Sequence, residues 1–158
     1  MRRIQRLGIV LAALAAAASA ERVEERRATF TGSRGDRGKC TIEVNVDDVA
    51  EVEISGDRGR LRTLSGQPSV WRRFECSDPL PRDFADFRYS GVDGRGRQFL
   101  LKDPRNNRGV AVIRIEDPKG GREGYTFDIE WSKGSDDRNR DGDRDRDRDR
   151  NRDRDKDH

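Results

Sequence analysis

Apolar residues recur at every second position through much of the stretch from residue 21 to 132. In Cys40–Val46 the apolar side chains stand at even positions and the polar ones at odd positions. A period of two is typical of a β-strand that buries one face. The pattern resumes in Ala50–Ile54 after Asp47 and Asp48, so we expect these two segments to pair as a β-hairpin. It returns in Tyr125–Trp131, whose four apolar side chains we place in the core.

Further segments with strand character follow along the chain. They are Arg60–Leu64, Val70–Cys76, Asp86–Ser90, Gln98–Lys102, Val110–Glu116 and Tyr125–Trp131. No stretch of this region keeps apolar residues at i, i+3, i+4 and i+7 over three turns, so we expect little helix. We therefore predict an all-β fold over residues 21–132, a single antiparallel β-sandwich, with a β-barrel as the alternative.

Glycine-rich segments separate the predicted strands. Gly-Asp-Arg-Gly occurs twice, at Gly35–Gly38 and Gly56–Gly59, each time just before a strand pattern, and we interpret both as turns. Gly91–Gly96 also lies between two strand patterns, without the Lys-Ser or Lys-Thr that opens the helix of a phosphate-binding loop. We expect it to be a hairpin loop.

The first 20 residues have the three-part pattern of a secretory signal peptide. Three arginines within residues 2–6 precede the apolar run Ile9–Ala18, and Ala18–Ala20 is a small-residue cleavage site before Glu21. The apolar run is shorter than the roughly 20 residues that a membrane-spanning helix needs. We expect export to the periplasm or the medium, without a stable membrane anchor.

Removal of this leader changes the charge of the chain. The full sequence has 34 Lys and Arg against 31 Asp and Glu, and the leader contains Arg2, Arg3 and Arg6. Without it, 31 residues of each sign remain. A formally neutral, exported domain is a poor match for nucleic acid, whose binding depends on neutralising phosphates, so we predict no nucleic-acid partner.

The last segment, residues 133–158, has a different composition. It contains ten basic and ten acidic side chains in near-strict alternation and no apolar residue. Ordering a backbone costs about 1–2 kcal/mol per residue, and nothing here can be buried to offset that cost. We predict a disordered, low-complexity polyampholyte tail. Asp137, Asn139 and Asp141 match half of a calcium-binding loop, but Arg148 stands where the loop needs glutamate, so we predict no metal site.

Cys40 and Cys76 are the only two cysteines of the chain. Each lies in a predicted strand, and an exported protein meets an oxidising environment, so we predict a disulfide between them. The bond would close a loop of 37 residues, counting both cysteines. Its position fits a buried bridge either between two strands or between two sheets.

The only histidine is His158, the last residue of the predicted tail. Catalytic triads, cysteine–histidine dyads and histidine-based zinc sites all need an imidazole held in place, so the folded region excludes them. We predict no catalytic residue and no cofactor. A pair of carboxylates, as in glycosidases, remains as the alternative, and Asp86 is a candidate member of such a pair.

Strict alternation places Trp71 and Arg73 on the outer face of their strand, opposite Phe74 and Cys76. An exposed indole beside arginines is suited to stacking on a flat ligand, so Trp71, Arg72 and Arg73 are the ligand-binding candidates. The ligand would be a glycan or another exported protein. The alternative is a β-bulge that turns Trp71 into the core.

Four segments resemble a group of uncharacterised exported bacterial proteins with a small β domain. These segments are Lys39–Val44, Trp71–Cys76, Gly91–Gln98 and Tyr125–Trp131. The resemblance covers roughly residues 38–132 and implies a bacterial exported domain. It carries over no activity, ligand or functional residue. Taken with the residues themselves, it favours an exported, non-catalytic binding or structural module, with the carboxylate-pair enzyme as the alternative.

Overall fold

A computed structural model describes residues 21–32 and 35–134 of the chain. The predicted signal peptide (residues 1–20) lies outside these described residues. So does the segment from residue 135 on, which includes the calcium-loop match at Asp137, Asn139 and Asp141. The last described strand ends at Lys133, the residue at which the predicted tail begins.

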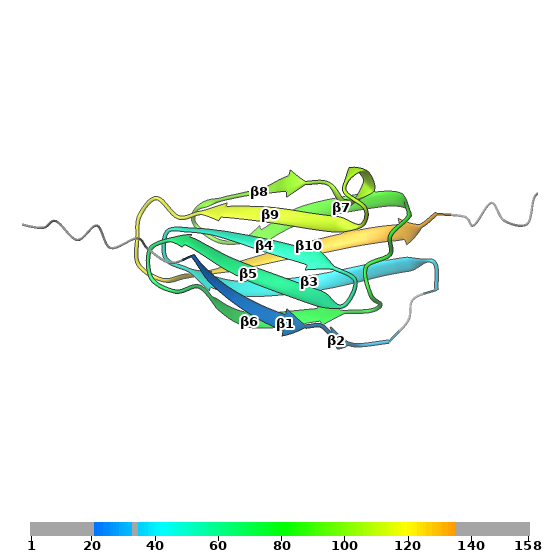
Figure 1. The fold of residues 1–158 in the computed structure, drawn as a ribbon, viewed down its shortest axis with the longest axis horizontal. Coiled ribbons are helices and arrows are strands. Elements are labelled where there is room, and N and C mark those ends of the chain that lie inside the picture. The colour runs from blue at the N-terminus through cyan, green and yellow to red at the C-terminus, as the bar shows by residue number, and fades with distance from the viewer. Residues whose placement is uncertain (1–20, 33–34, 135–158) are drawn as a thin grey trace, which may run out of the picture.

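Two five-stranded β-sheets lie face to face (Figure 1). Sheet A contains, in spatial order, β1 (Arg22–Arg27), β5 (Arg58–Ser65), β4 (Val49–Ser55), β9 (Val110–Glu116) and β8 (Arg97–Lys102). Sheet B contains β2 (Thr29–Phe30), β6 (Val70–Cys76), β3 (Arg37–Val46), β10 (Glu123–Lys133) and β7 (Phe84–Asp93). The all-β sandwich is therefore confirmed.

All strand pairs are antiparallel except the short pair β2–β6, which is parallel. Within the described ranges the one helical element is a 3-10 turn, η1 (Pro104–Asn106), so no helix there has the length to cross a membrane. The strands are thus joined by turns and sheet-to-sheet connections alone.

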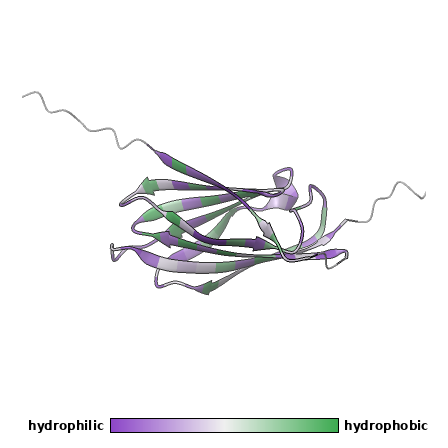
Figure 2. Ribbon diagram, turned by 90° about the horizontal axis from the view of Figure 1, so that it is seen from below, coloured by the Kyte–Doolittle hydropathy of each residue, from purple (hydrophilic) through white to green (hydrophobic). Residues whose placement is uncertain are grey.

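The core lies between the two sheets and is built from the inward row of each strand. Hydrophilic and hydrophobic residues alternate along the ribbons in Figure 2. The fully buried, larger side chains are Tyr125, Phe74, Phe127, Ile42, Ile54, Leu61, Ile113, Ile115, Ile129, Val44, Val46 and Val52. The inward placement predicted for the β10 side chains is confirmed, because Tyr125, Phe127 and Ile129 are fully buried and Trp131 is 3% exposed.

Two connections predicted as hairpins join different sheets instead. β3 belongs to sheet B and β4 to sheet A, so the chain crosses the sandwich at Asp47 and Asp48. Likewise β7 extends to Asp93, and the chain crosses at Gly94–Gly96 to reach β8 in sheet A. Both hairpin predictions were wrong because the period of two reports a buried face and says nothing about which strand is the pairing partner.

Each Gly-Asp-Arg-Gly copy does form a turn, and each also makes room for a tryptophan. Gly35 has φ 73° and Gly56 has φ 60°, a left-handed conformation that glycine adopts without steric cost. A Cβ atom on Gly38 would overlap the indole of Trp131. On Gly59 it would lie 2.6 Å from Cη2 of Trp71. The final glycine of each copy is therefore part of the core packing.

β1 and β2 are consecutive segments of one chain that change sheets at Ala28. β1 pairs with β5 in sheet A, and β2 pairs with the end of β6 in sheet B. All six residues of β1 are exposed, which explains why its sequence, rich in Arg and Glu, carries no period of two. A hydrogen bond connects β1 to the core: Nε1 of the buried Trp71 donates to the carbonyl of Glu24 at 3.1 Å.

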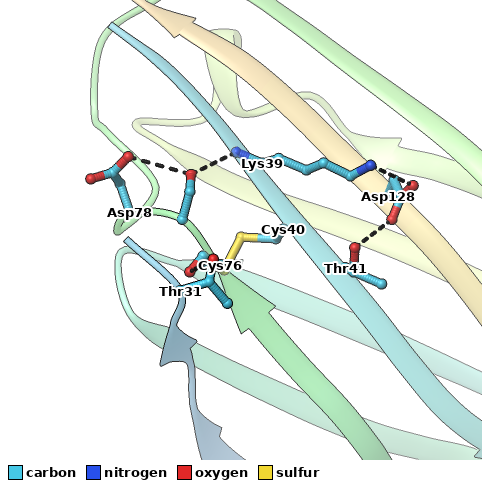
Figure 3. The surroundings of a disulfide bond; sticks show 8 residues. Thr31, Lys39, Cys40, Thr41, Cys76, Asp78 and Asp128 are labelled. Carbon is cyan, nitrogen blue, oxygen red and sulfur yellow. Dashed lines mark hydrogen bonds and ion pairs between the residues drawn. A yellow bond between two sulfur atoms is a disulfide. The ribbon is translucent and has the colours of Figure 1, made fainter. Parts of the chain in front are cut away.

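The disulfide joins Cys40 of β3 to Cys76 of β6, with the two Cα atoms 4.0 Å apart (Figure 3). The two residues face each other directly in the antiparallel register, so the bond lies within sheet B. Of the two alternatives, the bridge between neighbouring strands is the one observed. Both cysteines are buried, at 0% and 1% exposure.

Replacing both cysteines in C40A/C76A is expected to lower the free energy of unfolding by about 4 kcal/mol, since the unfolded chain regains the freedom of a long loop. Urea denaturation of the variant and of the parent protein, with and without reductant, measures the effect. A variant as stable as the oxidised parent would contradict this stabilising role. Reductant should leave the stability of the variant unchanged.

Alanine at Gly38 or Gly59 is expected to lower the free energy of unfolding by about 1–3 kcal/mol, because each methyl group must displace a tryptophan ring. Gly124 of β10 provides the matched control, since a Cβ there would meet only Asn45 Oδ1 at an ordinary 3.6 Å. G124A should be neutral or slightly stabilising. Equal urea midpoints for G38A, G59A and G124A would refute the packing role of the two glycines.

Candidate functional site

Trp71 lies in the core, as the alternative of a β-bulge that turns this side chain inward had it. Along β3 and β6, Glu43 pairs with Arg73 and the next residue, Val44, pairs with Trp71, which leaves Arg72 as the extra residue of a bulge. The indole is 5% exposed and stacks on Phe74 with a centroid separation of 5.4 Å. The expectation of an exposed stacking ring was wrong, because alternation along β6 is broken by one residue.

Arg72 and Arg73 remain exposed at the surface of sheet B. Arg73 donates to Glu75 at 2.7 Å and to Glu43 at 3.4 Å, and the hydrogen bond to Glu75 is the main reason that its pKa is raised. These contacts hold Arg73 against its own sheet. A ligand-binding role for Arg72 and Arg73 stays a prediction.

A groove runs across the outer face of sheet B, over β3, β7 and β10. Its volume is about 420 Å³. The residues that line it are Arg37, Gly38, Lys39, Asp86, Arg88, Glu130, Trp131 and Ser132. We call this hollow the β3–β7–β10 groove. The inward rows of β3 and β10 are buried in the core and β7 adds the buried Phe87, so the core holds the backbone beneath the charged residues of the groove.

Lys39 separates this groove from a second hollow of about 340 Å³ over β3 and β6, which Arg73 and Glu75 help to line. The ammonium group of Lys39 lies 3.2 Å from Asp128 (Figure 3) and 3.7 Å from Glu130. The hydroxyl of Thr41 donates to Asp128 at 2.8 Å. Lys39 is therefore engaged by two carboxylates of β10, and its charge is largely compensated.

Arg37 and Arg88 have no ion-pair partner among the described residues. The nearby acids have partners: Glu130 is the neighbour of Lys39, and Asp86 accepts the backbone N–H of Phe87 at 2.9 Å. Two guanidinium groups thus offer their donors to solvent within one groove. The groove is open to an anion at these two positions.

The outer face of sheet A has charged residues in a different arrangement. Arginines on β5 and β9 lie beside glutamates on the same or neighbouring strands, so opposite charges face each other across this surface. The ion pairs are Arg60 with Glu25 and Glu53, Arg62 with Glu21 and Glu51, and Arg114 with Glu51 and Glu116. A hollow over these strands measures only about 80 Å³. Most charged side chains on this face of sheet A are therefore compensated, although Arg58 and Lys102 have no ion-pair partner among the described residues. The β3–β7–β10 groove differs in that two unpaired guanidinium groups line the same hollow.

Two carboxylates, Asp86 and Glu130, line the β3–β7–β10 groove. Asp86 is exposed, and the side chain of Glu130 is 52% exposed. A carboxyl group that acts as general acid normally needs burial to keep its proton at neutral pH. Across residues 21–32 and 35–134, no group of three or more His, Cys, Asp and Glu side chains is arranged to hold a metal ion.

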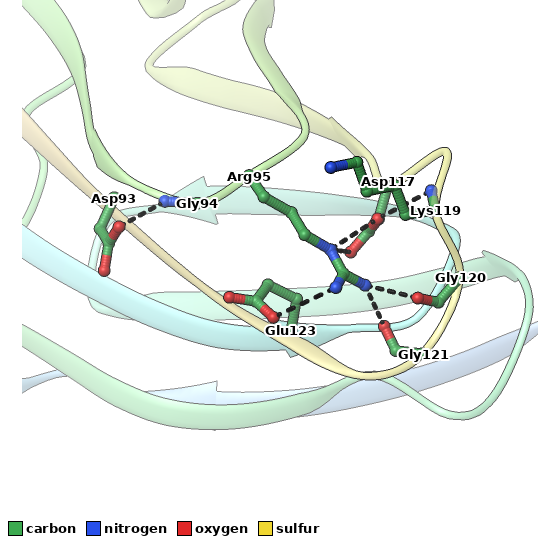
Figure 4. Close-up of polar contacts among 8 residues, drawn as sticks. All are labelled: Asp93, Gly94, Arg95, Asp117, Lys119, Gly120, Gly121 and Glu123. Atoms are coloured by element: carbon green, nitrogen blue, oxygen red, sulfur yellow. Dashed lines mark hydrogen bonds and ion pairs between the residues drawn. The ribbon is translucent and has the colours of Figure 1, made fainter.

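A second polar cluster ties two connections together at one end of the sandwich (Figure 4). The buried carboxylate of Asp117 accepts from Nε of Arg95 at 3.1 Å and from the backbone N–H of Lys119 at 3.2 Å. The same guanidinium donates to the carbonyls of Gly120 and Gly121. Because Asp117 has partners on both sides, we assign this cluster to fixing the loops and not to ligand binding.

The sequence pattern placed Glu130 on the outer face of its strand, but it could not bring β3, β7 and β10 side by side. Arg37 and Arg88 were missed for this reason. Both belong to or adjoin predicted strands, yet nothing in a single strand distinguishes an arginine that has a cross-strand partner from one that lacks it. The register of three strands that are distant in sequence makes that distinction.

Both tyrosines of the chain, Tyr89 and Tyr125, are expected to titrate late. Burial raises the pKa of each phenol from 10.0 to about 12, and the Asp117 carboxylate adds to the shift of Tyr125. Since the unfolded chain releases these protons first, the stabilisation is complete below pH 10 and is lost as the pH rises towards 12. Tyrosinate absorbance measures this directly. A full absorbance change near pH 10 in folded protein would contradict it.

No protein-family model, curated protein or solved structure matches the chain.

Proposed function

We propose that this protein is an exported, non-catalytic binding module that holds an acidic glycan in the β3–β7–β10 groove. The observation that carries the proposal is the pair of unpartnered guanidinium groups, Arg37 and Arg88, on the lining of one groove. A guanidinium binds carboxylate and sulfate groups through two parallel hydrogen bonds. These are the charged groups that acidic glycans carry.

The size and rigidity of the groove support this proposal. Its volume of about 420 Å³ falls within the range of about 300–1,000 Å³ that is usual for ligand pockets. Arg37 lies on β3 and Arg88 on β7, the two strands that pair with β10, so their backbone positions are fixed before the ligand arrives. A preorganised site loses less conformational freedom on binding. The Ser132 hydroxyl and the Asp86 carboxylate can accept from sugar hydroxyls.

Recognition in this groove depends on charge and not on ring stacking. Trp71 is buried, and the indole of Trp131 lies beneath Gly38 with 3% of its surface exposed. Export is part of the proposal. The leader pattern in residues 1–20 and the buried disulfide between Cys40 and Cys76 both support it, because such a bond persists in oxidising compartments.

The second candidate is a carbohydrate-active enzyme, which the presence of Asp86 and Glu130 in the same groove favours. Against it, both side chains are exposed, and Glu130 is already paired with the Lys39 ammonium. An acid–base pair would need one group that keeps its proton. Binding is the better-supported function.

Calorimetry against polygalacturonate, with neutral dextran as the comparison polymer, tests the proposal. Binding to polygalacturonate should weaken about tenfold for each of R37Q and R88Q, since each removes a charge-assisted contact. R58Q is the matched control, because Arg58 of β5 is an exposed arginine on sheet A. Equal binding of both polymers, or an equal loss in R58Q, would overturn the proposal. Release of reducing ends that D86N abolishes would establish the enzyme instead.

A further inference from the structure

We infer that the Asp/Arg segment from residue 135 to 158 is an intramolecular occupant of the β3–β7–β10 groove, with its aspartates placed against Arg37 and Arg88. The inference goes beyond ligand binding, because it assigns a role to a segment of the chain that the domain itself does not use.

The segment is attached at one end of the groove. β10 ends at Lys133, and the next residue, Gly134, donates its N–H to the carbonyl of Asp83 at 3.3 Å, just before β7 begins. Ser132, two residues before Gly134, lines the groove. Figure 1 shows that the described chain ends at the tip of β10, at the opposite end of the sandwich from the start of β1. Whatever follows Gly134 therefore begins within a few residues of Arg37 and Arg88.

In nearly all of this segment the acidic residues stand at odd sequence positions and the basic residues at even ones. From Asp137 on, every odd position is Asp or Asn, and the even positions are Arg or Lys except for Gly142 and His158. In an extended chain, successive side chains point to opposite sides. One side of an extended segment would therefore carry Asp and Asn and no cation, and the other would carry the Arg and Lys side chains and no anion. A helix would mix the two signs on every face.

The groove is complementary to the acidic side. Lys39 is paired with Asp128 and Glu130, so the charges of the groove without an ion-pair partner among the described residues are the two guanidinium groups and the Asp86 carboxylate, which accepts the N–H of Phe87. The two guanidinium groups outnumber this one carboxylate. The acidic row would face Arg37 and Arg88, and the basic row would remain in solvent. Length is no obstacle: 24 residues reach roughly 80 Å when extended, more than twice the roughly 36 Å of the 11-residue strand β10.

Attachment to the same chain makes such weak contacts effective. Ion pairs at a protein surface are individually weak and are screened by salt. A tethered partner is present at an effective concentration in the millimolar range, so it can occupy the groove where a free peptide would not. An external anion must displace it, which lowers the apparent affinity by the fraction of time that the groove is occupied. Only this last consequence rests on the proposed function.

The test uses full-length chains, and its central variant has the same composition as the parent protein. One exchange variant combines six substitutions that swap neighbouring residues: R140D/D141R, D145R/R146D and D149R/R150D. In this variant the odd and the even positions both carry mixed charge, while the net charge stays the same. Amide NMR spectra of the parent protein should show signals of Gly38, Lys39 and Arg88 that move between low and high ionic strength. In the exchange variant and in R37Q/R88Q these movements should be lost, and in R58Q they should persist.

Equal salt-dependent movements in the parent protein and the exchange variant would overturn the inference. Movements that vanish on dilution would overturn it as well, because the occupant would then be the segment of a second copy. The exchange variant should also bind polygalacturonate about threefold more tightly than the parent protein. If neither chain binds that polymer, the proposed function fails, while the NMR comparison still decides whether the segment occupies the groove.

Discussion

The register of β3 is the constraint on which the rest of the structure depends. Its inward row, from Cys40 to Val46, is fully buried in the core, and its outward row supplies Arg37 and Lys39 to the groove. A shift by one residue would exchange the two rows, so core and groove would be lost together. Two contacts oppose such a shift. The disulfide fixes β3 to β6, and the packing of the Trp131 indole against Gly38 fixes β3 to β10.

The sequence predicted the strands better than it predicted their partners. Val70–Cys76 and Val110–Glu116 have the predicted bounds, because apolar residues in a period of two report burial of one face, which is a local property. Pairing is not local, so the connections at Asp47–Asp48 and Gly94–Gly96 cross between sheets with the same alternation that a hairpin would show. β1 escaped prediction because a strand that buries no side chain has no apolar period.

The candidate site was less predictable than the fold, and for a related reason. Trp71 was misplaced because a single extra residue, Arg72, reverses the alternation within β6. Arg37 and Arg88 could not be singled out, because a charged residue becomes available to a ligand only when its cross-strand neighbours leave it without a partner. On sheet A the neighbours of Arg60, Arg62 and Arg114 compensate these charges, and over the groove of sheet B the neighbours of Arg37 and Arg88 do not. That difference arises from tertiary register.

β1 is one of the two edge strands of sheet A, and its exposed side chains are mostly charged. An outer strand offers unpaired backbone groups to any other extended chain, which is a common route to aggregation. Another molecule that added a strand beside β1 would bring its side chains against those of Glu24, Glu25 and Arg26. The charged side chains of β1 therefore disfavour the addition of an apolar strand at this edge.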